Sequence, residues 1–160
     1  MVLSHIRSRP CRRLRPKSDG FADRVRSRGK CPGGRRHNAG LSSTSNDITD
    51  LDAFTTGGAY NFALTDGHDL TVDGTVNAGS HTIALTTKGS GHDIAIDAKL
   101  EGGTIDLVSA GKVTETNADA IVANLLNVTA QTGITLTSSK NKIKKLGTDK
   151  TKTGPNKVTL

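Results

Sequence analysis

The sequence has few of the residues that fill the core of an ordinary globular domain. Aromatic residues make up 2% of its 160 positions, Trp is absent, and hydrophobic residues reach only 33%. Large aromatic side chains normally fill the space between packed layers, whereas a narrow core of Ile, Val and Leu does not require them. The 18 Gly residues, with recurring Thr, Asn and Asp, are typical of many short strands joined by many turns.

Cysteines and long apolar runs are also scarce. The two cysteines, Cys11 and Cys31, both lie near the start of the sequence. Without ligand partners at metal-site spacing they give only a weak zinc signal, so we interpret them as free thiols. No stretch approaches the roughly 18 apolar residues that a transmembrane helix needs. The first residues contain no apolar run that would form the core of a signal peptide, so any export signal is expected to lie outside this sequence.

The net charge of +7 averages three unlike segments. Residues 1–40 hold twelve Lys and Arg, including every Arg, against two Asp. Residues 41–139 hold three Lys against twelve acidic residues, and residues 140–160 hold seven Lys against one Asp. The basic pI of the whole chain is therefore no argument that the acidic middle segment binds nucleic acid.

The Arg-rich segment 1–40 is predicted to be disordered. It combines Arg runs with Pro10, Pro16 and Pro32 and lacks apolar periodicity, so it buries too little surface to offset its ordering entropy. A basic arm for nucleic acid or an anionic membrane is a second interpretation, although no aromatic residues are interleaved for base stacking. The abrupt change from Arg to Lys supports a third interpretation, in which a mis-assigned start or a rearranged gene makes this segment foreign to the rest.

An internal repeat dominates the middle segment. The run Gly67–Asp73 recurs 24 residues later as Gly91–Asp97, residues 82–85 match 104–107, and fainter copies occupy 126–137. The apolar residues sit two apart in six runs: Leu70/Val72, Ile83/Leu85, Ile94/Ile96, Ile105/Leu107, Leu126/Val128 and Ile134/Leu136. A period of two places these side chains on one face of a strand.

The spacing of the repeat favours a coil over a set of hairpins. A coil with two strands per repeat would place Leu70 on Ile94 and Val72 on Ile96, with about 4.8 Å between strands. Hairpins predict no such in-register identity, so an antiparallel sandwich is the less favoured alternative. We therefore predict an all-β chain in which residues 41–147 form a parallel β-solenoid of a few coils.

Two segments between the strands have their own predictions. Gly-rich runs such as Glu101-Gly102-Gly103 are expected to form turns between the strands. The segment 117–127 fits a looser coil with strands, and a short helix is the minority alternative.

The end of the sequence is also interpreted as part of a repeat. Residues 148–160 are predicted to be the Lys-rich end of a truncated repeat. Because solenoids need terminal caps and neither end shows an obvious one, we expect a fragment of a longer repeat array.

Three runs in the middle segment carry a resemblance to a known family: Leu70–Gly79, Thr82–Thr87 and Ile105–Gly111. They resemble the haemagglutination-type repeats of filamentous-haemagglutinin-like and other large exported bacterial adhesins. The resemblance implies a right-handed parallel β-helix, export across the outer membrane, and adhesion or display at the cell surface. The partners that it implies are a protein or glycan on a host or neighbouring cell, and the adjoining repeats of a longer chain.

The histidines of the middle segment could form a catalytic or metal site, but the residues around them do not support one. His68-Asp69 and His92-Asp93 would stack one coil apart, and His–Asp pairs suit acid–base or metal chemistry. Both pairs lie in Gly-flanked turns and arise from the repetition itself, while His81 has no evident partner. We therefore interpret them as solvated turn residues.

The outward-facing acidic residues offer the other route to chemistry. Asp73, Asp97 and Asp106 would cluster on a groove, and β-helix hydrolases use paired carboxylates; isolated Asp residues in turns would bind Ca²⁺ only weakly. No Arg follows residue 36, which weakens a lyase-like site. We predict no catalytic, cofactor-binding or metal-binding residues and no enzyme activity, only a structural or adhesive segment. A fragment of a polysaccharide lyase or hydrolase is the alternative.

Overall fold

A computed structural model of the chain describes residues 38–56, 60–116 and 120–158. All of them lie within one compact unit, Arg36–Leu160. The predicted disordered segment 1–40 falls almost entirely outside the described residues, as do both cysteines. Every element in the described part of the chain is a strand, so none of those residues belongs to a helix able to cross a membrane.

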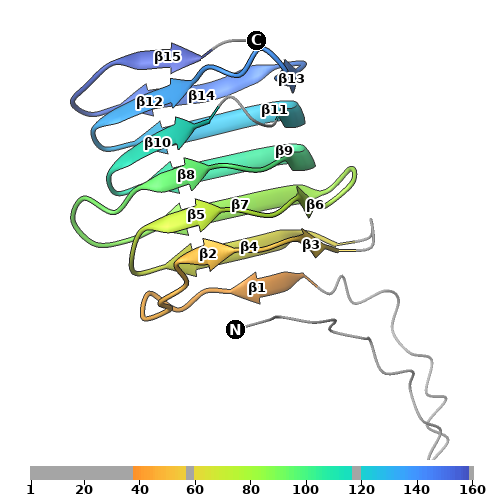
Figure 1. Cartoon of the computed structure of the whole chain (residues 1–160), viewed down its shortest axis with the longest axis horizontal. Coiled ribbons are helices and arrows are strands. Elements are labelled where there is room, and N and C mark those ends of the chain that lie inside the picture. Colours follow the sequence, from red (N-terminus) through yellow and green to blue (C-terminus); the bar gives the residue numbers. More distant parts are fainter. Residues whose placement is uncertain (1–37, 57–59, 117–119, 159–160) are drawn as a thin grey trace, which may run out of the picture. The chain divides into compact units, whose positions relative to one another are not determined.

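The strands wind into two parallel sheets that stack coil upon coil (Figure 1). The first sheet contains β1 (Ala39–Leu41), β3 (Phe54–Thr55), β4 (Phe62–Asp66), β6 (Val76–Asn77), β7 (Thr82–Thr87), β9 (Leu100–Ser109), β11 (Ile121–Ala130), β13 (Lys142–Ile143) and β14 (Leu146–Thr151). The second contains β2 (Asp50–Leu51), β5 (Leu70–Val72), β8 (Ile94–Ile96), β10 (Lys112–Glu115), β12 (Gly133–Leu136) and β15 (Asn156–Val158). The predicted all-β parallel solenoid is confirmed.

The predicted register of the repeat is confirmed residue by residue. Leu70 pairs with Ile94 and Val72 with Ile96, so the 24-residue identity does reflect direct stacking. The matched run 82–85 pairs with 104–107 through Ile83 and Ile105. The offset is not constant along the stack, however, because Ile94 pairs with Val113 only 19 residues later. Shorter turns explain why the later copies are fainter in the sequence.

Each coil has a third strand position that the two-strand repeat did not predict. Strand β6 pairs with the start of β9 through Val76 and Leu100, and β3 pairs with β6. The predicted turn at Gly102-Gly103 is wrong, because both glycines lie within β9. Without side chains they let the strand bend past the preceding coil, where the Gly103 amide donates to the His81 carbonyl at 2.8 Å.

The segment after residue 119 is extended. Strand β11 runs from Ile121 to Ala130 and pairs with β9 along almost its whole length. The helical alternative is therefore wrong for residues 120–127, whereas 117–119 lie outside the described residues. β-branched and aliphatic residues pack well on a pleated surface, and here they continue the ladders of the previous coil.

The core is a set of aliphatic columns that run along the stack. Its largest fully buried side chains are Leu64, Leu70, Ile83, Leu85, Ile94, Ile96, Leu100, Ile105, Leu107, Ile121, Leu126 and Ile134. Burying each such side chain stabilises the fold by about 1.5–3 kcal/mol. Because every coil supplies residues at the same positions, the scarcity of aromatic side chains does not leave the interior unfilled.

A buried polar ladder lines one corner of the coils, where the first sheet turns into the second. Thr87 and Ser109 are buried, and their hydroxyls both donate to the His92 carbonyl, at 2.8 and 2.9 Å. The Ser109 hydroxyl also accepts from the Gly111 amide at 3.1 Å. Backbone amides and carbonyls at a corner lose their partners in the β-sheet. They need side-chain partners there because a buried polar group without a hydrogen bond is costly.

Candidate functional site

The two histidines singled out in the sequence do stack on adjacent coils. The ring centroids of His68 and His92 lie 5.5 Å apart. Each ring, however, faces the aspartate of the preceding coil: His68 Nδ1 lies 3.4 Å from Asp47, and His92 Nδ1 lies 3.5 Å from Asp69. The side chains of His68 and Asp47 are 57% and 75% exposed, so solvent weakens this pairing.

The aspartates beside these histidines accept backbone hydrogen bonds between coils. Asp69 Oδ1 accepts from the Asp93 amide at 2.8 Å, and Asp93 Oδ1 accepts from the Lys112 amide at 2.7 Å. The Lys112 ammonium also lies 3.5 Å from Asp93 Oδ2. A carboxylate that accepts amide hydrogens forms a charge-assisted hydrogen bond, so this column ties each coil to the next. His81 is half-buried and donates its backbone amide to the Ala78 carbonyl.

The three outward-facing aspartates do not form one cluster. Asp73 and Asp97 follow the paired strands β5 and β8 of the second sheet. Asp106 lies on β9 in the first sheet, where its Oδ1 accepts from Asn127 Nδ2 at 2.7 Å. The proposed grouping of all three is therefore wrong, because period-two alternation says which side of a strand a residue occupies but not which sheet the strand joins.

The structure places an acidic side chain inside the coil that the sequence analysis missed. Glu115 is 8% exposed and pairs with Ile96 in the column of Val72. Its Oε2 accepts from the Ser138 amide and from Asn141 Nδ2, at 3.1 and 2.9 Å. The alternation from Val113 to Glu115 was a usable signal, because it put a carboxylate in an aliphatic column.

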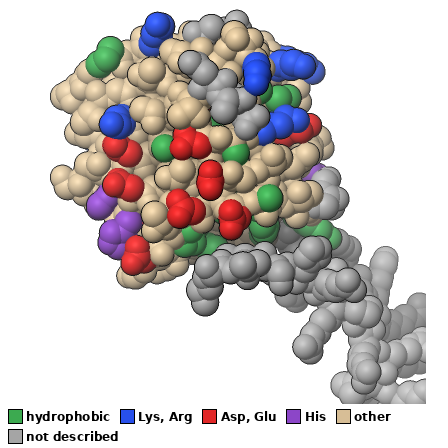
Figure 2. All heavy atoms as spheres, in the orientation of Figure 1, with side chains coloured by type: hydrophobic (Ala, Val, Ile, Leu, Met, Phe, Trp, Pro, Cys, Tyr) green, Lys and Arg blue, Asp and Glu red, His purple; other side chains and the backbone are tan. Residues whose placement is uncertain are grey.

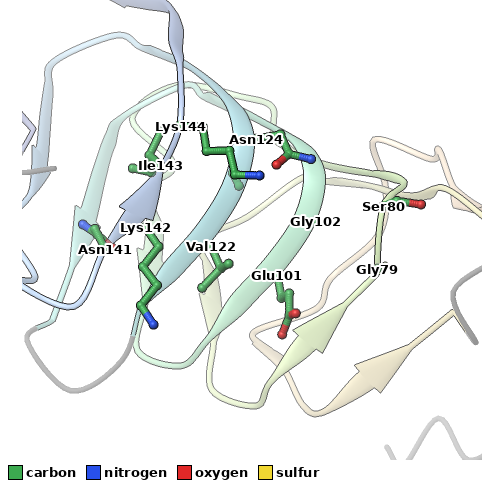
Figure 3. Close-up of a pocket in the computed structure, with 11 residues that line it drawn as sticks. Gly79, Ser80, Glu101, Gly102, Val122, Asn124, Asn141, Lys142, Ile143 and Lys144 are labelled. Carbon is green, nitrogen blue, oxygen red and sulfur yellow. The ribbon is translucent and has the colours of Figure 1, made fainter.

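A shallow groove of about 580 Å³ runs across the third strand positions (Figure 3). Its floor is a registered outward-facing column in which Glu101 pairs with Val122 and Val122 with Lys142. Lys144 and Asn124 extend toward one another above this column (Figure 3). The groove lies beside the corner at which β9 and β11 bend, and the loop residues Gly79 and Ser80 form part of its wall.

The groove has one carboxylate among the described residues that line it. That carboxylate belongs to Glu101, and its Oε2 lies 2.6 Å from the Lys99 ammonium. Lys142 and Lys144 therefore keep an excess of positive charge within it. Ammonium groups beside amide and hydroxyl groups suit an anionic, hydrogen-bonding ligand, and glycoside hydrolysis ordinarily requires a second carboxylate.

The described residues contain no group of three or more His, Asp or Glu side chains placed to hold one metal ion.

Comparison of the chain with protein-family models, with curated proteins and with solved structures found no match.

Proposed function

We propose that the chain is a non-catalytic structural and adhesive segment of a bacterial adhesin displayed at the cell surface. The observation that carries the proposal is the way its acidic groups are used. Asp69 and Asp93 accept backbone amides of the next coil, and Glu101 pairs with Lys99. These carboxylates join coils or neighbouring side chains, which suits a scaffold that extends by stacking.

The outer surface supports an adhesive role. Along the strands, outward positions carry Thr, Asp, Asn and Lys, and the groove presents Lys142 and Lys144 beside Asn124. A shallow surface with exposed ammonium and amide groups fits a long anionic glycan, which binds through many weak contacts and needs no deep pocket. The ligand that we propose for the groove is therefore an acidic polysaccharide on a host or neighbouring cell.

Binding of acidic polysaccharides without cleavage distinguishes this proposal from a polysaccharide lyase or hydrolase. The full chain, incubated with polygalacturonate, alginate or hyaluronan, is expected to be retained on the immobilised polymer without cleaving it. Retention is measured by surface binding, and cleavage by new reducing ends and by the ultraviolet absorbance of unsaturated products. Cleavage of any of these polymers would establish the enzymatic alternative, and failure to be retained on all of them would refute the adhesive role of the groove.

Reversing the charge of the groove lysines tests whether retention depends on the groove, and reversing a lysine elsewhere is the control. The double variant Lys142→Glu and Lys144→Glu is expected to weaken retention about tenfold or more, because each lost ion contact is replaced by repulsion. Lys88→Glu reverses an exposed lysine that does not line this groove, and it should leave retention within about twofold of the original. Equal losses in both variants would show that binding depends on net charge and not on the groove.

A further inference from the structure

A buried polar network lies directly behind one wall of the groove. Glu115, Ser138 and Asn141 are all buried, and Asn141 also lines the groove, next to Lys142 (Figure 3). Glu115 Oε2 accepts hydrogen bonds from the Ser138 amide and from Asn141 Nδ2, at 3.1 and 2.9 Å. A single carboxylate oxygen therefore holds both ends of the turn that leads into the groove lysines.

The same network joins this turn to the preceding coil. Glu115 belongs to β10 of that coil, and Asn141 Oδ1 accepts from the Ile121 amide of β11 at 2.8 Å. Ile121 immediately precedes Val122, which forms the floor of the groove beside Lys142. Figure 2 shows the lysines of the viewed face mainly on the upper coils, which include the coils that the network joins.

Strand β13 has few backbone hydrogen bonds of its own. It is two residues long, and it pairs with Val122 and Ala123 of β11. The Lys144 amide adds one bond beyond the strand, to the Ala123 carbonyl at 3.0 Å. A segment with so few contacts opens locally at low cost, so the side-chain network at its start decides how firmly the wall is held.

We propose that Glu115 is a positioning residue for the groove, which holds through Asn141 the segment that carries Lys142 and Lys144. The role rests on the proposed binding of an anionic glycan by these lysines. A wall that is already ordered loses less conformational freedom when the ligand binds, so the affinity increases. A carboxylate suits the position because a charged oxygen that accepts two donors forms strong hydrogen bonds.

Two substitutions of Glu115 separate hydrogen bonding from packing. In Glu115→Gln the amide oxygen can take the place of Oε2, and the amino group that of Oε1, which has no hydrogen-bond partner in the described part of the chain. Glu115→Leu keeps an apolar side chain in the aliphatic column beside Ile96 but offers no acceptor to Ser138 or Asn141. A role in packing alone predicts that both variants behave alike in the groove.

Hydrogen exchange of single amides, measured by NMR on the full chain, tests whether the wall is held. In Glu115→Leu the protection of the Lys144 amide is expected to fall about tenfold or more, because the wall opens locally. The Gly103 amide, which donates to the His81 carbonyl in the body of the stack, should keep its protection. Glu115→Gln should keep the protection of both amides.

Retention on immobilised polygalacturonate tests whether the held wall serves binding. Glu115→Leu should weaken retention about fivefold or more, and Glu115→Gln should leave it within about twofold of the original. In a chain that already carries Lys142→Glu and Lys144→Glu, Glu115→Leu should cause no further loss, because it acts through those lysines. Asn141→Ala removes the same contact from the other side and should match Glu115→Leu, so the test does not depend on the folding of one variant.

Three results would overturn the positioning role. They are full Lys144 protection in Glu115→Leu and Asn141→Ala, equal loss at Lys144 and Gly103, and lost Lys144 protection with unchanged retention. Failure of the proposed function gives a different result, in which the unmodified chain is not retained or the reversal of Lys142 and Lys144 has no effect. The exchange rates would then identify the network as structural alone.

Discussion

Replacing Ile105 with Ala is expected to lower the free energy of unfolding by about 2–5 kcal/mol. Ile105 is fully buried and lies in the middle of a column, paired with Ile83 on one side and Leu126 on the other. Coils on both sides hold the strand in place, so the cavity left by the missing methyl and methylene groups has little freedom to collapse. The change is measured by urea unfolding followed by circular dichroism.

Val108→Ala is the matched control for that experiment. Val108 lies three residues later on the same strand, faces outward and is 38% exposed. Its truncation should change the unfolding free energy by no more than about 0.5 kcal/mol. If both variants lost the same stability, Ile105 would not occupy an interior column and the stacking of coils would be wrong.

Replacing Gly103 with Ala should destabilise the chain by about 3 kcal/mol or more, although it adds only one methyl group. A Cβ at this position would overlap the Ser80 carbonyl oxygen and lie 2.6 Å from the Ser80 carbonyl carbon. Both atoms belong to the backbone of the preceding coil, which cannot rotate away as a side chain would. The hydrogen bond from the Gly103 amide to His81 would be strained by any compensating shift.

The matched control is Gly40→Ala in the first coil. A Cβ at Gly40 would meet nothing within 4 Å, and the residue is exposed. Its replacement should leave stability unchanged or raise it slightly, because Ala restricts the unfolded chain more than Gly does. The two variants are compared by thermal and urea unfolding. A neutral Gly103→Ala variant would contradict the close approach of the coils at this corner.

The stacking of the coils could be predicted because one pair of repeats kept its length. The repeats that contain Leu70 and Ile94 keep the same length and the same residue types. Residues that match in sequence therefore also pair in the structure. Elsewhere the register survives while the turns change length, as between Ile94 and Val113. There only the alternation of apolar residues remains, and alternation identifies strands without identifying their partners.

The third strand position and the groove could not be predicted for a related reason. Strands β6 and β13 are two residues long, too short to show alternation. The groove lies at the bend of β9 at Gly102-Gly103, which has the composition of a turn. The pairing of Gly102 with Ala123 and the hydrogen bond from the Gly103 amide to the His81 carbonyl hold this bend within a strand. Tertiary pairing overrides local preference here, as it often does in sheets.

The burial of Glu115 could not be predicted for a different reason. Its place in the alternation was readable, but an acidic residue among aliphatic ones is ordinarily taken as the end of a strand, since burying a carboxylate is costly without partners. Those partners come from residues more than 20 positions later, through Ser138 and Asn141. Asn141 in turn accepts from the Ile121 amide at 2.8 Å. Only the coiled arrangement brings these groups together.

Successive repeats stack in parallel and in register, and a disulfide between adjacent coils is the most direct measurement of that stacking. Thr71 and Ala95 pair on adjacent strands, about 4.8 Å apart, within the Cα separation that a disulfide spans. Thr71→Cys with Ala95→Cys, in a chain also carrying Cys11→Ser and Cys31→Ser, should therefore oxidise to an intramolecular disulfide seen by peptide mapping. Thr71→Cys with Thr114→Cys, two coils apart, should not. An antiparallel sandwich predicts no such preference, and equal cross-linking of both pairs, or none at 71 and 95, would contradict the stacked solenoid.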